Sequence, residues 1–227
     1  MTTTRFSRFA HRFGWGAFRR LSPLQRITVL ALLALVFGLA RLGVFIALHL
    51  VPSDYSIVSH AVSDYAVGPT RRLSSVMTWL TAGFWALLAG AVITGVPDWS
   101  DATGMTIALL VLAGIFVALP FAPTDLEGEK TTLVGRLHYL FAIAWFALSY
   151  ACMGNFTRLF TAEGPTWLAG ALGVIAWIAA ISLAVSVLVL IVKRLRPKVF
   201  GISERIFILS VSLFYIGVAA GLMMLSA

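Results

Sequence analysis

The sequence is poor in cysteine and in charge. A single cysteine, Cys152, excludes a disulfide framework and a zinc site built from cysteines. Charged residues make up only 11% of the 227 residues, whereas hydrophobic residues make up 60%. Together with a mean hydropathy of +0.95, this shortage of charge excludes an arrangement of soluble domains. The chain is therefore expected to lie in a membrane.

What the sequence has instead is a series of long apolar runs. Runs of about 20 residues are long enough to cross a hydrocarbon core that is ~30 Å thick. Solid runs favour helices, because the strands of a membrane barrel would show short, alternating segments. We therefore predict an all-α fold, a polytopic transmembrane bundle of six helices, within residues 27–227. The expected spans are 27–51, 73–96, 102–121, 136–153, 167–192 and 205–227.

Residues 1–26 form a separate basic N-terminal segment. It contains six arginines and no acidic residue. Phenylalanines fall on one side of its helical wheel and arginines on another, which is typical of a helix lying in the membrane interface. A disordered basic tail that only sets the topology is the alternative. Ser22 and Pro23 are expected to cap and begin the first span.

Polar residues are concentrated in three segments between the apolar runs, at 52–72, 120–138 and 193–205. Successive spans alternate in direction, so the connections after the first, third and fifth spans share one side of the membrane. With the span ends beside them, these connections hold six of the nine acidic residues and three of the four histidines. We therefore expect one polar site at that face, which binds a lipid headgroup or a small ligand.

The candidate binding residues come from this face and from the first span beneath it. They are His49, His60, Ser63, Asp64, Asp125, His138, Glu204 and Arg205, together with Arg41. A cation at membrane depth costs ~2.5–3.5 kcal/mol, so it normally faces the bundle interior and a partner. We expect Arg41 to pair with an acid in this way, rather than to extend toward the interface.

The residues before the last span allow two interpretations. Ser203 is a suitable N-cap for a helix that starts at Arg205, and Glu204 would then lie near the positive end of the helix dipole. Alternatively, Glu204 and Arg205 bridge to Asp64 or Arg72 in the first polar segment. Such bridges would fasten the polar segments together.

The same face offers a possible metal site. His60, Asp64, Asp125 and His138 could bind a divalent ion such as zinc, with one position open for water. That set would support a metal-assisted hydrolase acting on a lipid. Helix capping by the two histidines is the simpler interpretation, because the sequence has no HExxH motif. Haem ligation by His49 and His138 is disfavoured, since haem ligands usually lie deeper in a bundle.

The charge balance indicates lipid partners. A net charge of +8 favours anionic lipid surfaces over nucleic acid, because no soluble domain is available to present a basic face. The arginine-rich tail favours a cytoplasmic N-terminus in the cell membrane, which places the polar face outside the cytoplasm. Nine lysines and arginines in the polar segments weigh against this orientation. The sequence identifies neither a catalytic residue nor an oligomeric state, and a purely structural membrane subunit is also compatible with it.

Three motifs carry a family resemblance: SHAVSDYAVG at 59–68, PFAPTDLEGEK at 120–130 with GRLH at 135–138, and GISER at 201–205. The chain resembles the membrane family called domain of unknown function 998, which implies a six-helix membrane protein and no established activity. The matching positions are Ser63, Asp64, Thr124, Asp125, Gly135, His138, Gly201 and Arg205. Thr124 stands where the family commonly has cysteine, which argues against essential thiol chemistry in this chain.

Overall fold

The structure, a computed structural model, describes residues 21–125, 132–192 and 194–225, and within these ranges it is all-helical with no strand. The long helices are α2 (Pro23–Leu50), α3 (Arg71–Gly95), α4 (Ala102–Ala118), α5 (Leu133–Ala151), α6 (Met153–Glu163), α7 (Thr166–Ile191) and α8 (Arg196–Leu225). Short 3-10 helices lie in the connections: η1 (Val62–Ala66), η2 (Gly68–Thr70) and η3 (Leu119–Phe121). The interfacial segment expected at 1–26 falls mostly outside the described residues.

Six stretches of helix are long and apolar enough to cross a membrane, in the part of the chain that the structure describes. They are Leu24–Leu50, Gly68–Gly95, Ala102–Phe121, Leu133–Glu163, Thr166–Ile191 and Arg196–Leu225. The predicted all-α fold with six membrane-spanning helices is therefore confirmed by length and composition.

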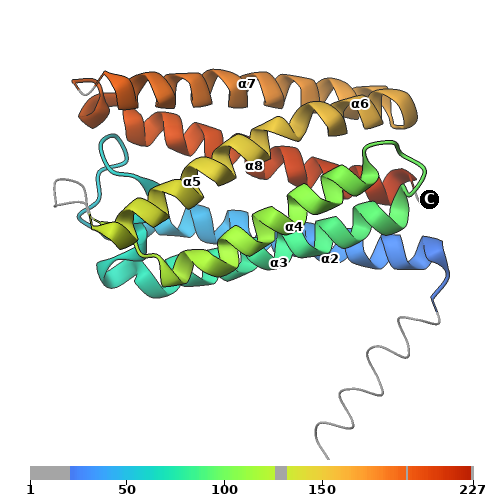
Figure 1. The fold of residues 1–227 in the computed structure, drawn as a ribbon, viewed down its shortest axis with the longest axis horizontal. Coiled ribbons are helices and arrows are strands. Elements are labelled where there is room, and N and C mark those ends of the chain that lie inside the picture. The colour runs from blue at the N-terminus through green and yellow to red at the C-terminus, as the bar shows by residue number, and fades with distance from the viewer. Residues whose placement is uncertain (1–20, 126–131, 193, 226–227) are drawn as a thin grey trace, which may run out of the picture.

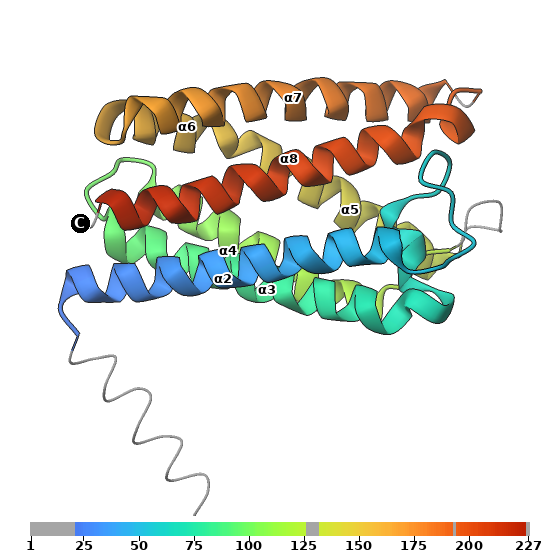
Figure 2. The ribbon, with the colours of Figure 1, turned by 180° about the vertical axis from the view of Figure 1, so that it is seen from behind.

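α8 is the central helix of the bundle. In its most apolar stretch 61% of the residues are buried, compared with 22% in that of α7. α8 packs against α7 on one side and α2 on the other, and α3 and α4 follow beyond α2 (Figures 1 and 2). Gly221 permits a close approach, because a Cβ there would lie 2.5 Å from the Phe160 ring of α6 and 2.7 Å from Leu168 of α7.

The start of α2 confirms the predicted helix cap. The Ser22 hydroxyl accepts a hydrogen bond from the Gln25 amide at 3.2 Å, and the Gln25 side chain accepts one from the Ser22 amide at 2.9 Å. Pro23 follows as the first helical residue, where its missing N–H is not needed. This capping box starts the helix ahead of the expected Ile27.

The segment 155–166, which lies between the expected spans 136–153 and 167–192, is mostly helix. It belongs largely to α6, which ends at Glu163 and buries Phe156 and Phe160 on one face. Polar residues such as Arg158 lie exposed on the other face. The segment is an amphipathic helix, whose polar face gives it the composition of a loop.

The last helix also begins earlier than expected. α8 starts at Arg196 rather than Arg205, with Pro197 in its first turn, where proline is well tolerated. Ser203 is therefore not an N-cap, and its hydroxyl donates to a carbonyl of the preceding turn at 3.0 Å. Residues 196–205 of the basic segment 193–205 are helical and occupy fixed positions on α8.

The connections that follow α2, α4 and α7 lie at one end of the bundle, which we call the polar end (Figures 1 and 2). The connections α3–α4 and α6–α7 lie at the opposite end. The structure thus brings the described parts of the three polar segments to one end, as the alternation of six spans predicts.

Candidate functional site at the polar end

Arg205 joins three parts of the chain at the polar end. Its Nε donates a hydrogen bond to His49 Nε2 at the end of α2, at 2.8 Å. Its Nη1 donates to the carbonyl oxygens of His60, at 2.7 Å, and of Gly201, at 2.9 Å. The guanidinium carbon also lies 5.7 Å from the centre of the Tyr65 ring. Arg205 is only 7% exposed, so its side chain is enclosed by these partners.

Gly201 lies one turn before Arg205. It allows the loop between α2 and α3 (residues 51–70, called the loop below) to approach α8. Its amide donates to the Val58 carbonyl at 3.0 Å. A Cβ at Gly201 would lie 2.4 Å from the Ile57 carbonyl oxygen and 2.8 Å from that of His60. These contacts are with backbone, so a side chain could not be accommodated by a rotamer change. Glycine is therefore required here for close packing, which explains its place in the GISER motif.

Two buried carboxylates order the start of η1. Glu204 Oε2 accepts a hydrogen bond from the Val62 amide at 2.7 Å, and Asp64 Oδ2 accepts one from the Ala61 amide at 3.1 Å. These are consecutive amides at a helix N-terminus, where N–H groups lack partners within the helix. Of the two interpretations of the GISER segment, the second is closer to the structure. Glu204 and Arg205 do reach the first polar segment, but they bind its backbone and His49.

The hydrogen bonds of His49 fix its tautomer. His49 Nδ1 lies 2.7 Å from the Phe45 carbonyl oxygen, and a carbonyl can only accept. Nδ1 therefore carries the hydrogen. Since Nε2 accepts from Arg205, the ring is neutral in this arrangement.

Aromatic rings pack around the histidines. The Tyr55 ring centre lies 5.6 Å from that of His60 and 5.5 Å from that of Tyr65. Its hydroxyl donates to the Val67 carbonyl at 3.1 Å, so it closes the loop on itself. Partial burial raises the pKa of Tyr55, and the nearby carboxylates of Asp64 and Asp54 add to this effect. The candidate binding residues chosen from the sequence did not include Tyr55 or Tyr65, although Tyr65 directly follows Asp64 in its motif.

His60 contributes to this site through its backbone. Its carbonyl accepts from Arg205, whereas its Nδ1 accepts from the Ser56 amide at 3.1 Å and lies 3.1 Å from the Ser59 hydroxyl. Ser63 lies in η1 and is partly exposed. The imidazole of His60 therefore stabilises its own loop in this structure.

Asp125 and His138 form a second cluster, at the α4–α5 connection. Asp125 Oδ2 accepts from the Thr132 amide at 2.7 Å, and Oδ1 accepts from the Thr132 hydroxyl at 2.9 Å. His138 lies inside α5, and its Nδ1 is 2.8 Å from the Ala122 carbonyl oxygen. A Cβ on Gly135 would lie 1.9 Å from Asp125 Oδ2, so the glycine leaves room for the carboxylate. Both polar residues anchor the connection to the first turns of α5.

The four proposed metal ligands are divided between these clusters. His60 and Asp64 lie with Arg205, whereas Asp125 and His138 lie at the α4–α5 connection. Over the described ranges, no three histidine, cysteine, aspartate or glutamate side chains form a group that could hold a metal ion. Zinc binding at these residues stays a prediction.

Arg41 faces the bundle interior, as predicted, but its hydrogen-bond partners are hydroxyls rather than an acid. Arg41 is 3% exposed. Its Nε donates to the Thr81 hydroxyl of α3 at 2.9 Å, and its Nη1 donates to the Ser212 hydroxyl of α8. Thr81 and Ser212 in turn donate to carbonyls of their own helices. The expected pairing with an acid was wrong, because these hydroxyls are closer and can pass the hydrogen bond on to backbone carbonyls.

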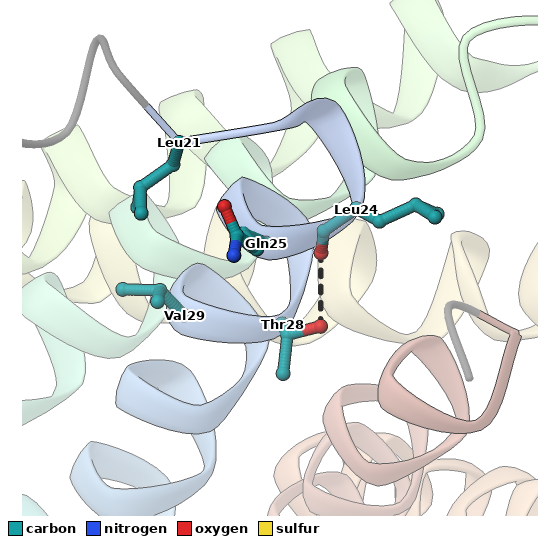
Figure 3. A pocket seen from close by; sticks show the side chains of 5 residues that line it. All are labelled: Leu21, Leu24, Gln25, Thr28 and Val29. Atoms are coloured by element: carbon teal, nitrogen blue, oxygen red, sulfur yellow. Dashed lines mark hydrogen bonds between the residues drawn. The ribbon is translucent and has the colours of Figure 1, made fainter.

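Two surface hollows lie away from these clusters. One, of about 450 Å³, surrounds the start of α2, where the Thr28 hydroxyl donates to the Leu24 carbonyl at 2.9 Å (Figure 3). It is lined by Leu21, Leu24, Gln25, Thr28 and Val29. The other, of about 380 Å³, lies between the α5–α6 junction and α7. Arg205 lines neither hollow, and in this structure the loop covers it.

Six helical stretches of the described chain, α8 at their centre, are long and apolar enough to span a membrane, which indicates a multi-pass membrane protein. The chain belongs to the family described as "Protein of unknown function (DUF998)", whose sequence profile matches residues 35–221. The resemblance seen in the motifs is therefore confirmed. No curated protein and no solved structure shows a significant match to the chain.

The motif positions of the family meet in the structure. Asp125 packs against Gly135 at the α4–α5 connection. The His60 carbonyl of the first polar segment lies against Gly201 and accepts a hydrogen bond from Arg205. The motifs therefore describe how the connections of the polar end are fastened to the helices.

Gly201→Ala is expected to destabilise the protein by ~1–3 kcal/mol, because its Cβ meets backbone that cannot move aside. The matched control is Gly170→Ala in α7, where nothing lies within 4 Å of an added Cβ. Gly170→Ala should be neutral or stabilising, since alanine favours helix over glycine by ~1 kcal/mol. Thermal unfolding of the purified variants measures both. Equal effects of the two substitutions would contradict the proposed packing.

Arg41→Met is expected to leave thermal stability unchanged or higher, because the Thr81 and Ser212 hydroxyls keep acceptors on their own helices. Thr81→Val should instead cost ~1–3 kcal/mol, since it leaves a buried guanidinium N–H without its acceptor. That cost should disappear when Thr81→Val is introduced into the Arg41→Met background. A cost that persists in the double variant would show that Thr81 does not act through Arg41.

Proposed function

We propose that the polar end binds the anionic headgroup of a membrane lipid. The observation that carries this proposal is a set of exposed cations from three separate segments, here called the basic rim. The rim consists of Arg71, Arg72, Arg136, Arg194 and Lys198. These residues lie at the ends of α3, α5, α7 and α8, where a membrane helix meets the lipid headgroups.

In the part of the polar end that the structure describes, the acidic residues do not cancel this charge at the surface. Glu204 and Asp64 are buried and bind backbone amides, and Asp125 is bound to Thr132. Asp54, in the first polar segment, is exposed. The described surface of this end is therefore strongly positive. Each lysine or arginine near an anionic leaflet contributes ~1 kcal/mol of attraction, so five cations favour anionic over zwitterionic lipid.

Arg205 supports an anion position inside the rim. Its acceptors are a ring nitrogen and two carbonyl oxygens, all of them neutral. Its Nη2 is buried and makes no hydrogen bond. A buried donor without a partner is costly, and a phosphate oxygen is a strong acceptor for guanidinium. This side chain is thus suited to hold a headgroup phosphate that the rim attracts.

Phosphatidylglycerol added to the detergent-purified protein is expected to raise its unfolding temperature more than phosphatidylcholine does. A ligand that binds only the folded state stabilises it, and ~1 kcal/mol corresponds to roughly 2–4 °C for a protein of this size. The double variant Arg71→Gln, Arg72→Gln should lose roughly two-fifths of this shift, because it removes two of the five rim cations.

Arg158→Gln is the matched control for that measurement. Arg158 is exposed at the opposite end, where it lies 3.6 Å from Asp101. This variant should keep the full lipid-dependent shift. If the two lipids stabilise the protein equally, or if Arg158→Gln loses as much of the shift as the rim variant does, the proposal fails.

A further inference from the structure

On one edge of the Arg205 guanidinium, only one of the two nitrogen donors makes a hydrogen bond. In a guanidinium, Nε–H and the nearer Nη2–H point in parallel from the same edge and can bind two oxygens of a carboxylate or phosphate at once. Here Nε donates to His49, whereas Nη2 has no partner although it is buried. The single bond to His49 therefore occupies an edge that is shaped for two oxygens.

From this geometry we infer that the Nε–Nη2 edge of Arg205 is an oxyanion site that neutral His49 keeps closed and that protonation of His49 opens. The ring accepts from Arg205 only while Nε2 is unprotonated, because Nδ1 already carries the hydrogen donated to Phe45. A second proton would place an N–H against an N–H and two cations against each other. The hydrogen bond from Arg205 and the second proton therefore compete for His49 Nε2. Acidification favours the form in which the Nε–Nη2 edge of Arg205 is free.

The charged groups around His49 come from each element that packs there. α8 contributes Arg205 and the buried Glu204, whose carboxylate binds the Val62 amide. η1 contributes Tyr65, whose ring centre lies 5.3 Å from that of His49, and the buried Asp64. α3 contributes only Arg71 and Arg72, its two titratable residues, and both are exposed.

Of these groups, Arg205 is the one that donates a hydrogen bond to His49. The carboxylates of Asp64 and Glu204 instead accept from backbone amides of Ala61 and Val62. The group whose hydrogen bond responds to protonation of His49 is therefore Arg205.

Opening also loosens the loop that covers Arg205. The loop is held to α8 by three kinds of contact: Arg205 to the His60 carbonyl, Glu204 to the Val62 amide, and the Gly201 amide to the Val58 carbonyl. All three come from two turns of α8, so a shift of Arg205 weakens the neighbouring contacts. Val62, which is 4% exposed, should then become accessible.

The test is thiol labelling of full-length Val62→Cys protein in neutral detergent, without added anion, between about pH 8 and about pH 5.5, which brackets ordinary histidine titration. The labelling rate is divided by that of Ser56→Cys, an exposed position in the same loop, which removes the intrinsic pH dependence of the thiol. The native Cys152 is buried and gives little background.

We expect this ratio to rise about tenfold on acidification, which corresponds to loss of one charge-assisted hydrogen bond. The rise should be absent in His49→Gln, because a glutamine amide can donate to Phe45 and accept from Arg205 at any pH. It should persist in His60→Gln, which removes the histidine of the loop itself. A flat ratio in the otherwise native background overturns the inference, and so does a rise that survives in His49→Gln.

The identity of the oxyanion rests on the proposed function and is tested separately. At about pH 5.5, inorganic phosphate and phosphatidylglycerol are each added, and the unfolding temperature of the native protein is compared with that of Arg205→Lys, which lacks the two-donor edge. Stabilisation that depends on Arg205 supports the site, whether free phosphate or only the lipid produces it. If neither probe stabilises the protein in a way that depends on Arg205, the oxyanion site is overturned. The labelling result still decides, by itself, whether protonation of His49 releases Arg205.

Discussion

A buried guanidinium that must find its acceptors inside an apolar bundle organises the polar end. Arg205 lies on the central helix, where lipid offers no hydrogen bonds and water has little access. Its acceptors come from the end of α2, from the loop and from its own helix, so satisfying one side chain brings three parts of the chain together. Gly201 is part of the same requirement, because any side chain there would push the accepting carbonyls away.

The same arrangement links structure to the proposed function. The buried acids Glu204 and Asp64 order the loop through its amides, and this leaves mainly arginines and lysines on the described exposed surface of the polar end. A positive rim around a recessed guanidinium is suited to an anion that arrives from the membrane surface. His49 adds a proton-dependent element, since it holds one donor of the edge that such an anion would use.

The sequence predicted the parts of this structure that depend on simple patterns. Apolar runs gave the six spans, alternation gave the shared end, and Ser22-Pro23 gave the start of α2. It did not predict what depends on packing. Charge made α6 and the first turns of α8 resemble loops, although one face of each is buried. Residue type alone does not specify three-dimensional contacts. These include the use of the His60 carbonyl, the hydroxyl partners of Arg41 and the different hydrogen-bond partners of His60 and His138.

Arg205 on α8 and His49 on α2 are expected to be energetically coupled, since they share a hydrogen bond. A double-mutant cycle with Arg205→Met and His49→Phe, measured by unfolding at about pH 8 where histidine is ordinarily neutral, tests this coupling most directly. The account predicts a coupling free energy of ~1–3 kcal/mol, because either substitution alone already removes the shared hydrogen bond. Effects that add to within about 0.5 kcal/mol would show two independent residues and would contradict the account.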